Sequence, residues 1–443
     1  PPAVTVTTAI EGLRTIEWGH ALLGDGQTNV IIITIIIICG LFAMQRAGTS
    51  SIGKLFGPLM TLWFLFLAGA GLFNMLGNLS ILRALNPIRG IMFLFSPINH
   101  SGIMVLGFVF LSTTGAEALY SDMGHVGKAN IYASWPFVKA ALILNYLGQG
   151  AWLLANNSNP QMLAMDIVNP FYMMLPEPLR PFAIVLSAVA AIIASQALIT
   201  GAFTMVSEAT GLNWMPHLQV RYPARTRGQL YIPVINWVLC AATLIVLGIF
   251  RDSEHISAAY GLALTITMIT TTILLAVYMW YDRKRVLAVV FTIVFLAIQL
   301  MFFIASMAKF LHGGWFTMLL TLAILFIMYT WNEGTKLERS QRRHMMPKDF
   351  LPALDKLHGD SRIHRFADNI VYLTSDPDLK RLDTDIFFSI FADHPKRARA
   401  WWAVSVQTTD EPFTREYSVQ NFGTSYLFRV RIRLGFKVSQ SIP

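Results

Sequence analysis

One acidic side chain, Glu117, lies in an otherwise apolar and hydroxyl-rich stretch that ends at Tyr120. The apolar run Ile103 to Leu111 comes directly before it, and the two together are long enough to cross a bilayer core, which takes about 20 residues. Burying a carboxylate there is costly, so its presence indicates a function. As an anion it attracts a cation, and a low dielectric favours its protonated form. We therefore expect Glu117 to bind a cation and to exchange a proton.

The residues around this carboxylate could complete a cation site. Thr114 lies three positions before Glu117 and shares its helical face, while Gly115 lets the helix break and turn backbone oxygens toward a cavity. Several neutral oxygens suit a large, weakly hydrated cation such as potassium. The alternative is that each hydroxyl bonds the backbone one turn earlier. The hydroxyls are those of Ser112, Thr113, Thr114 and Tyr120.

Polar residues in other apolar runs are weaker candidates. Thr5 and Thr8 precede Glu11, which lies near a helix end where a carboxylate can also reach water. Tyr260, beside Gly261, opens a threonine-rich run and could line a cavity or belong to an interfacial aromatic belt. For amide side chains inside apolar helices, hydrogen bonding between helices is the favoured role. These amides are Asn145, Gln149 and Gln196.

The elements that position these residues are predicted membrane spans. The chain has 443 residues, of which 54% are hydrophobic and 13% charged, whereas a soluble domain has about 25% charged residues. The net charge of +9 is better explained by lysines and arginines in cytoplasmic loops than by a nucleic-acid partner. We predict about ten spans in a cell-membrane protein. They are Pro1 to Leu13, Asn29 to Gln45, Phe56 to Met75, Ile103 to Tyr120, Pro136 to Leu154, Pro181 to Val206, Tyr231 to Phe250, His255 to Trp280, Arg285 to Ala308 and Gly314 to Trp331.

The composition changes near the C-terminus, where apolar runs become short and alternate with turn residues. We predict a transmembrane domain at 1–335 and a small α/β domain at 336–443, which loop charges place in the cytoplasm. The predicted strands are Asn369 to Leu373, Ile386 to Phe391, Trp401 to Val406 and Tyr426 to Val430.

Six motifs resemble those of the KUP (HAK/KT) potassium-uptake permeases, in the family's order and over essentially the whole chain. They are GKLFGPLMTLWF at Gly53 to Phe64, TTGAEALYSDMGH at Thr113 to His125, LNYLGQGAWLL at Leu144 to Leu154, ASQALITGAF at Ala194 to Phe203, YIPVINW at Tyr231 to Trp237 and AAYGLALT at Ala258 to Thr265.

This resemblance implies an all-α transporter of the amino-acid–polyamine–organocation superfamily, not an enzyme. It implies an inverted-repeat fold, a cytosolic C-terminal domain, and potassium uptake by proton symport through alternating access. Potassium and protons would be cargo, with no cofactor. The resemblance assigns proton coupling to Glu117 and Glu11. It assigns potassium binding to Thr114, Glu117, Thr5, Thr8 and Tyr260, of which Thr114, Glu117 and Tyr260 would be the direct metal ligands.

The family's first two helices have no counterpart in this sequence, so we expect a truncated chain that cannot transport although its parent can. We also expect the lipid bilayer as its surroundings and a homodimer through the cytosolic domain. One alternative is a transporter of the same fold for an amino-acid-type solute. A potassium channel is disfavoured because the sequence has no TVGYG-like filter. A membrane sensor with its output in the soluble domain is a further alternative.

Overall fold

A computed structural model describes most of the chain, and its contacts divide it into two units. The first comprises Pro1–Thr210, His217–Pro223 and Leu230–Phe326, and the second is mainly Ile327–Pro443. We treat each unit separately. The described residues are 2–24, 26–47, 53–100, 102–112, 114–115, 119, 127–159, 168–221, 230–341, 344–345, 350–374, 382–391, 394–409, 411, 413–435 and 438.

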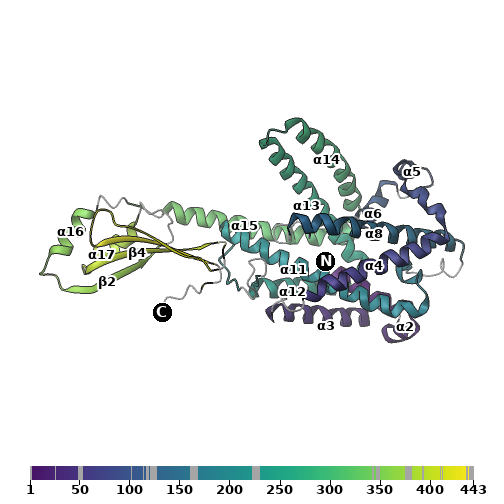
Figure 1. Cartoon of the computed structure of the whole chain (residues 1–443), viewed down its shortest axis with the longest axis horizontal. Helices are drawn as coiled ribbons and strands as arrows, with labels where there is room; N and C mark the ends of the chain where they lie inside the picture. Colours follow the sequence, from purple (N-terminus) through teal and green to yellow (C-terminus); the bar gives the residue numbers. More distant parts are fainter. Residues whose placement is uncertain are drawn as a thin grey trace. The chain divides into compact units, whose positions relative to one another are not determined.

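The first unit is built from helices (Figure 1). Among the described residues, seven helices are long and apolar enough to cross a membrane, or eight if the bent pair α2 and α3 forms one span. The long helices are α4 (Gly53–Gly77), α8 (Lys128–Asn156), α11 (Arg180–Gly211), α12 (Pro233–Phe250), α13 (Ser253–Tyr281), α14 (Arg285–Met307) and α15 (Gly314–Gln341). The shorter helices are α1 (Pro2–Glu11), α2 (Glu17–Leu23), α3 (Thr28–Met44), α5 (Pro87–Leu94), α6 (Leu106–Ser112) and α10 (Pro170–Met173). The 3₁₀ turns are η1 (Gly12–Thr15), η2 (Gln45–Ala47), η3 (Leu79–Leu85), η4 (Gly102–Val105), η5 (Glu177–Leu179) and η6 (Phe310–His312).

These helices confirm a polytopic membrane protein, while the count of ten spans and the inverted repeat remain predictions. α1 has 10 residues and ends at Glu11, where the sequence predicted an end. α6 has only 7 residues, so it crosses less than half of a bilayer core by itself.

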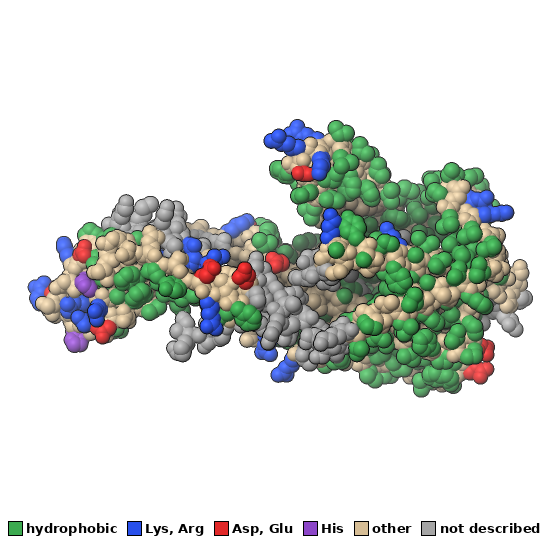
Figure 2. Space-filling view, viewed as in Figure 1, with side chains coloured by type: hydrophobic (Ala, Val, Ile, Leu, Met, Phe, Trp, Pro, Cys, Tyr) green, Lys and Arg blue, Asp and Glu red, His purple; other side chains and the backbone are tan. Residues whose placement is uncertain are grey.

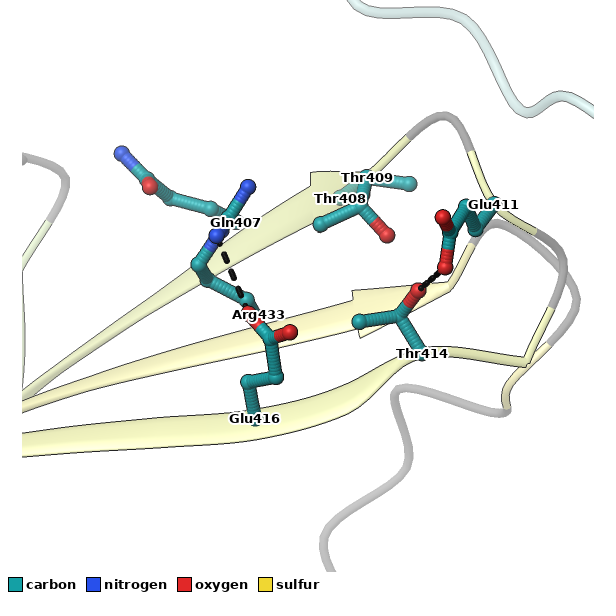
Figure 3. Close-up of a pocket in the computed structure, with 7 residues that line it drawn as sticks. All are labelled: Gln407, Thr408, Thr409, Glu411, Thr414, Glu416 and Arg433. Atoms are coloured by element: carbon teal, nitrogen blue, oxygen red, sulfur yellow. Dashed lines mark hydrogen bonds and ion pairs between the residues drawn. The ribbon is translucent and has the colours of Figure 1, made fainter.

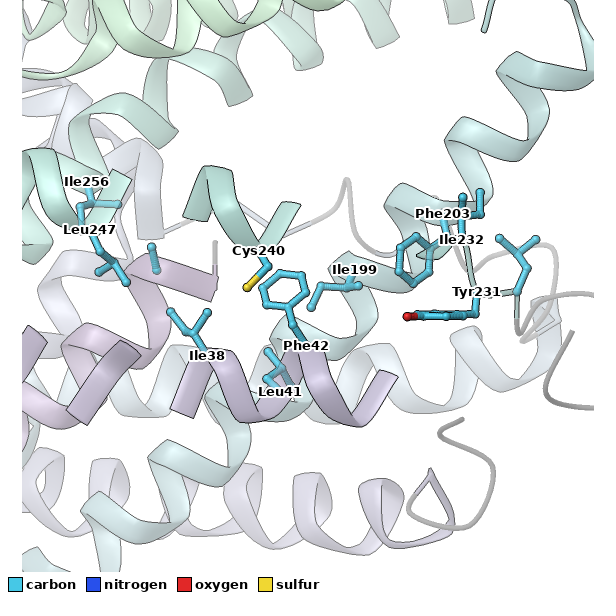
Figure 4. Packing of buried hydrophobic residues seen from close by; sticks show 12 residues of the cluster. Ile38, Leu41, Phe42, Ile199, Phe203, Tyr231, Ile232, Cys240, Leu247 and Ile256 are labelled. Carbon is cyan, nitrogen blue, oxygen red and sulfur yellow. The ribbon is translucent and has the colours of Figure 1, made fainter. Parts of the chain in front are cut away.

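The main core of the first unit joins α1, α3, α11 and α12 (Figure 4). Phe42 and Ile199 are almost completely buried there, together with Cys240. Figure 2 shows apolar side chains over much of the visible surface of the first unit. A soluble protein seldom exposes so much apolar surface, whereas a lipid-facing helix does so throughout its length.

α4 and α8 cross at two glycines. A Cβ on Gly71 would lie 2.3 Å from the carbonyl oxygen of Leu144, and a Cβ on Gly148 would lie 2.4 Å from that of Gly71. Both distances are far shorter than van der Waals contact, so only glycine fits at either position. Small residues at a helix crossing let two backbones approach closely, which drives packing inside a membrane.

The second unit contains a four-stranded sheet in the order β2-β4-β6-β5. β2, β4 and β6 are parallel, and β5 pairs antiparallel with β6. A parallel neighbour requires a crossover connection, which α17 provides between β2 and β4. The elements are β1 (His344–Met345), α16 (Leu351–Gly359), β2 (Arg365–Leu373), β3 (Leu382–Asp383), α17 (Thr384–Phe391), β4 (Arg397–Thr409), β5 (Arg415–Gln420) and β6 (Leu427–Gly435).

The two faces of this sheet differ in their cover. Leu354 of α16, Phe387 of α17 and Trp401 of β4 belong to one buried cluster on the first face. Apolar side chains also line the second face, but many of them are exposed, and they border a shallow groove of about 470 Å³. We call this second surface the open face. It comprises Val371 and Leu373 of β2, Trp402 and Val404 of β4, Phe428 and Val430 of β6, and Tyr417 and Val419 of β5.

Three of the four predicted strands are confirmed: two lie within β2 and β4, and the third, Tyr426 to Val430, overlaps β6 from Leu427 on. The prediction of a strand at Ile386 to Phe391 was wrong, because these residues form α17. Ile386, Phe387 and Ile390 are buried on one side, which is the 3.6-residue period of a helix and not alternation. β5 was missed, since it has six residues and only two of them, Tyr417 and Val419, are apolar. α15 continues to Gln341, past the predicted domain boundary.

Candidate cation-binding site

The helix that leads into the predicted site ends where the sequence suggested a break. α6 stops at Ser112, and Gly115 has a φ of +113°, outside the helical region. The Thr114 hydroxyl donates to the Leu111 carbonyl at 2.8 Å, and the Ser112 hydroxyl donates to that of Val109 at 2.7 Å. Both side chains therefore bond to backbone in this structure, as the alternative interpretation expected.

α13 lies on one side of this helix end. A Cβ on Gly261 would lie 3.4 Å from the Cδ2 atom of Leu111, so the end of α6 packs directly on α13 beside Tyr260. The phenol of Tyr146 on α8 donates to the Ser112 carbonyl at 2.8 Å. That bond satisfies a carbonyl which the end of the helix leaves without an intrahelical donor.

α14 holds the remainder of α6. A Cβ on Gly107 would lie 3.2 Å from the Ala305 carbonyl oxygen, and the rings of Phe110 and Phe302 are 5.1 Å apart. After α14 ends, the ammonium of Lys309 lies over the ring of Phe108, and burial lowers the pKa of Lys309. These packing contacts with α14 and the residues after it hold α6 in position.

The candidates on α1 have separate surroundings. The Thr5 hydroxyl is 3.5 Å from that of Ser195 on α11. Thr8 is exposed, and its hydroxyl donates to the Val4 carbonyl within α1 at 2.8 Å. Glu11 accepts a hydrogen bond of 2.6 Å from Ser253, the first residue of α13. α1 is therefore joined to α11 and to α13 by polar contacts.

Two hydroxyls near this region have no hydrogen bond in the described part of the chain. Thr7 on α1 and Thr34 on α3 are fully buried, and neither Oγ1 atom has a partner there. Thr7 could not be distinguished from its neighbours by sequence. Threonines occupy positions 5, 7 and 8, so the sequence does not show which of them faces the protein interior. Burial of its side chain is the signal that separates it.

Tyr260 lines a cavity of about 350 Å³ between α1, α3, α11, α12, α13 and α15. Most of its lining is aliphatic or aromatic. The Thr243 and Thr317 hydroxyls at this cavity donate to the carbonyls of Leu239 and Ala259, at 2.7 and 3.0 Å. The described part of the cavity is therefore apolar, and it does not surround Tyr260 with a shell of free oxygens.

The predicted central carboxylate, Glu117, lies outside the described residues, as do Thr113 and Tyr120. The structure thus brings together the elements that carry Thr114, Thr5, Thr8, Glu11 and Tyr260, since α13 contacts both α1 and α6. The ligand roles of these residues remain predictions. Ser195 and Ser253, the partners of Thr5 and Glu11, were not predicted as site residues, because a lone serine carries no signal of its distant partner.

One predicted contact between helices is confirmed. The Gln196 side chain on α11 pairs with that of Gln45, which follows α3, and each amide donates to the other. Both side chains are buried, so the pair satisfies polar atoms that would otherwise be costly inside a membrane. Asn145 on α8 is also buried, but its Oδ1 atom has no hydrogen-bond partner among the described residues.

A polar pocket of about 750 Å³ lies in the second unit, at the ends of β4 and β6 (Figure 3). Its Arg433 donates to the Glu416 carboxylate at 3.0 Å, and Thr414 donates to that of Glu411 at 3.0 Å. These lining groups therefore neutralise and satisfy each other. The pocket contains none of the predicted site residues, all of which belong to the first unit.

Several long apolar helices, the short helix α6 that ends at Ser112, and a separate sheet unit define a polytopic membrane protein. A family model described as "K+ potassium transporter integral membrane domain" matches residues 1–336. This match covers most of the chain, so the chain belongs to this family of potassium transporters, which are not enzymes. The membership confirms the resemblance seen in the sequence motifs.

The names of curated relatives agree with this family assignment. The chain is 73% identical to "Probable potassium transport system protein Kup 1" of Bifidobacterium longum over 442 residues, which are 100% of this chain and 74% of that protein. It is 71% identical to Kup 2 of the same organism, with 60% of that protein covered. Identity to the Kup protein of Streptococcus pyogenes serotype M3 is 48%, with 66% covered. The chain therefore spans about 60 to 74% of the length of these relatives.

Proposed function

We propose that the protein carrying this sequence imports potassium together with protons across the cell membrane by alternating access. Family membership and the names of the relatives support potassium as the cargo. Proton coupling is inferred from the chemistry of Glu117, the single carboxylate in its apolar stretch. The observation that carries the location of the site is the packing of Leu111, at the end of α6, on Gly261 beside Tyr260.

The break after α6 gives a physical reason for binding a cation here. Backbone carbonyls at the end of a helix have no intrahelical donors, and they carry the negative end of the helix dipole. Gly115 lets the chain leave the helix, so these oxygens can turn toward an ion together with the Thr114 hydroxyl. The Thr114 hydroxyl can keep donating to the Leu111 carbonyl while a lone pair of its oxygen faces the ion, so binding need not break this hydrogen bond.

Glu117 would couple the two cargoes through its charge. When it is ionised, its negative charge offsets the loss of water from potassium; when protonated, it loses most of that attraction. If the transporter changes between its outward-open and inward-open states only when both potassium and a proton are bound, it moves the two together. Glu11, joined to Ser253, is the second proposed proton-coupling group, and Thr5, Thr8 and Tyr260 are proposed to supply oxygens in the complete protein.

The test measures uptake by the full-length protein that carries this sequence, in bacteria that lack their own potassium uptake. Glu117→Gln should abolish the acceleration of rubidium uptake at low external pH, because glutamine cannot take up a proton. Thr114→Ala should raise the KM for rubidium about tenfold, the value of one lost ion-oxygen contact. Glu177→Gln, in an exposed turn, and Thr267→Ala, exposed on α13, are the matched controls.

Unchanged proton-dependent uptake by Glu117→Gln at every pH would exclude the coupling role. Competition experiments separate the alternative class. If the protein carried an amino-acid-type solute, uptake of that solute would be inhibited by excess amino acids and not by excess rubidium.

We also propose that the second unit lies in the cytoplasm and that it joins two copies of the protein. The open face supports such a contact, since it leaves apolar side chains exposed in an aqueous compartment.

A further inference from the structure

A groove runs between α13 and α14, close to the turn that joins them. Figure 1 shows the two helices side by side as a hairpin, and the groove has a volume of about 490 Å³. Among the described residues that line it, Thr292 is the only aliphatic hydroxyl, and it donates to the Ala288 carbonyl at 2.7 Å. The lining residues are Ala276, Val277, Trp280, Tyr281, Ala288, Val289, Thr292 and Ile293.

The turn beside this groove is basic. Arg283, Lys284 and Arg285 follow each other, with Asp282 as the one neighbouring acid. The Lys284 ammonium is 2.8 Å from the Asp282 carboxylate, and this bond raises the pKa of Lys284. The Arg285 guanidinium lies over the ring of Trp280, 5.4 Å from its centre. Figure 2 shows basic side chains gathered at the free end of the hairpin.

The lengths of the two helices place groove and turn at different depths of a membrane. α13 and α14 are both apolar enough to span it, so the part of the groove lined by Ala276, Val277 and Ile293 lies at the depth of the hydrocarbon. Trp280 and Tyr281 sit where α13 ends, and these residue types prefer the level of the lipid headgroups. The basic turn follows immediately, which puts its charges at the level of the phosphates.

We propose that this groove and turn bind one anionic phospholipid, with an acyl chain along the groove and the phosphate at Arg283 and Arg285. An acyl chain needs apolar contact and no hydrogen bonds, which matches the lining. A guanidinium presents paired donors that match phosphate oxygens. A zwitterionic phospholipid with the same chains fits the groove equally well but lacks the net charge, so it binds more weakly.

The experiment measures lipid retention by the whole chain in detergent, using native mass spectrometry. The purified protein is exchanged into mixtures of phosphatidylglycerol and phosphatidylcholine that have identical acyl chains. The unmodified protein should retain one phosphatidylglycerol in preference to phosphatidylcholine. The preference should fall as salt rises, since the attraction is electrostatic.

The first variant, R283Q/R285Q, removes both guanidiniums and keeps the pair of Lys284 with Asp282. It should weaken retention of phosphatidylglycerol about 25-fold, since each basic residue near an anionic surface contributes about fivefold. The matched control is R83Q/R89Q, which removes two exposed arginines elsewhere in the first unit. Equal retention by the two double variants would overturn the proposal.

A second variant tests the groove independently of charge. Ala276→Phe fills the groove from α13 while leaving all basic residues in place, and it should reduce retention at least fivefold. Retention that survives in Ala276→Phe would show that the basic turn binds the phosphate alone, which contradicts a lipid site. Both variants are compared only as monodisperse protein. If Ala276→Phe does not fold, Ala276→Val takes its place. Valine fills less of the groove, so we expect a smaller loss of retention.

Discussion

The Ser253 hydroxyl donates a 2.6 Å hydrogen bond to the carboxylate of Glu11, which joins the end of α1 to the start of α13. Hydrogen bonds to a charged acceptor contribute about 1.5–3 kcal/mol, and partial exposure lowers that value. Ser253→Ala should therefore lower the unfolding temperature by about 2–4 °C, measured by intrinsic fluorescence in detergent. Ser253→Thr, which keeps the hydroxyl, should retain most of the stability. Equal losses in the two variants would show that the hydroxyl does not stabilise the protein.

The crossing of α4 and α8 depends on the absence of a side chain at Gly71. Gly71→Ala places a methyl group where the Leu144 carbonyl oxygen already lies, so the helices must separate. We expect a loss of about 3 kcal/mol or more, as for other overpacked interiors, and a strongly reduced yield of folded protein. Gly69→Ala is the matched control, since no described residue lies within 4 Å of its Cβ position. Similar yields of folded protein from the two variants would contradict the crossing.

The second unit should lose stability in alkali through Tyr426. Its phenol donates to the Asp355 carboxylate at 2.5 Å, and burial, followed by this contact, raises the pKa of Tyr426 well above its ordinary value. The folded state therefore keeps the phenol proton that the unfolded chain loses near pH 10. Stability from this group is complete below pH 10 and falls as the pH rises further.

Tyr426→Phe should remove that alkaline component and cost about 1–2 kcal/mol below pH 10. Hydrogen exchange of the β4 and β6 amides at several pH values measures both effects. Tyr417→Phe on β5 is the control, because that side chain is highly exposed. An unchanged alkaline slope in Tyr426→Phe would show that another group titrates.

The open face should mediate the proposed contact between two copies. Val404→Glu places a charge at the centre of this face, beside Trp402 and Val430, where a partner would have to bury it. We expect the dimer to weaken at least tenfold, as measured by light scattering of the purified protein. Phe388→Glu is the control, since Phe388 is an exposed apolar residue on α17, away from the open face. If both variants or neither dissociate the dimer, the open face is not the specific contact.

Helices and strands with strong periodicity could be predicted from sequence, because an element that buries one face has apolar residues at regular intervals along the chain. The long spans and the cores of β2, β4 and β6 are of this kind. Ile386 to Phe391 was misassigned because a short run of apolar residues fits both periods, and contact with α16 and the sheet decides between them. β5 was missed because it is a short edge strand whose two alternating apolar residues, Tyr417 and Val419, are exposed and give too brief a repeat.

The candidate site shows a similar division. The break near Gly115 could be predicted, because glycine beside hydroxyl residues is a local signal. The proximity of Leu111 to Gly261 could not, since 149 intervening residues separate them (261 − 111 − 1). The same holds for Glu11 with Ser253 and for Gln45 with Gln196. Such pairs arise from tertiary packing, which leaves no periodicity in either segment.

Gly115 has a φ of +113°, and no described residue lies within 4 Å of the position that a Cβ would occupy. As far as the described residues go, the restriction at this position is one of handedness and not of room. An L-residue would be strained there, whereas its mirror image prefers positive φ. A semisynthetic protein with D-alanine at position 115 should keep the kink, and L-alanine, with the same number of atoms, should straighten it.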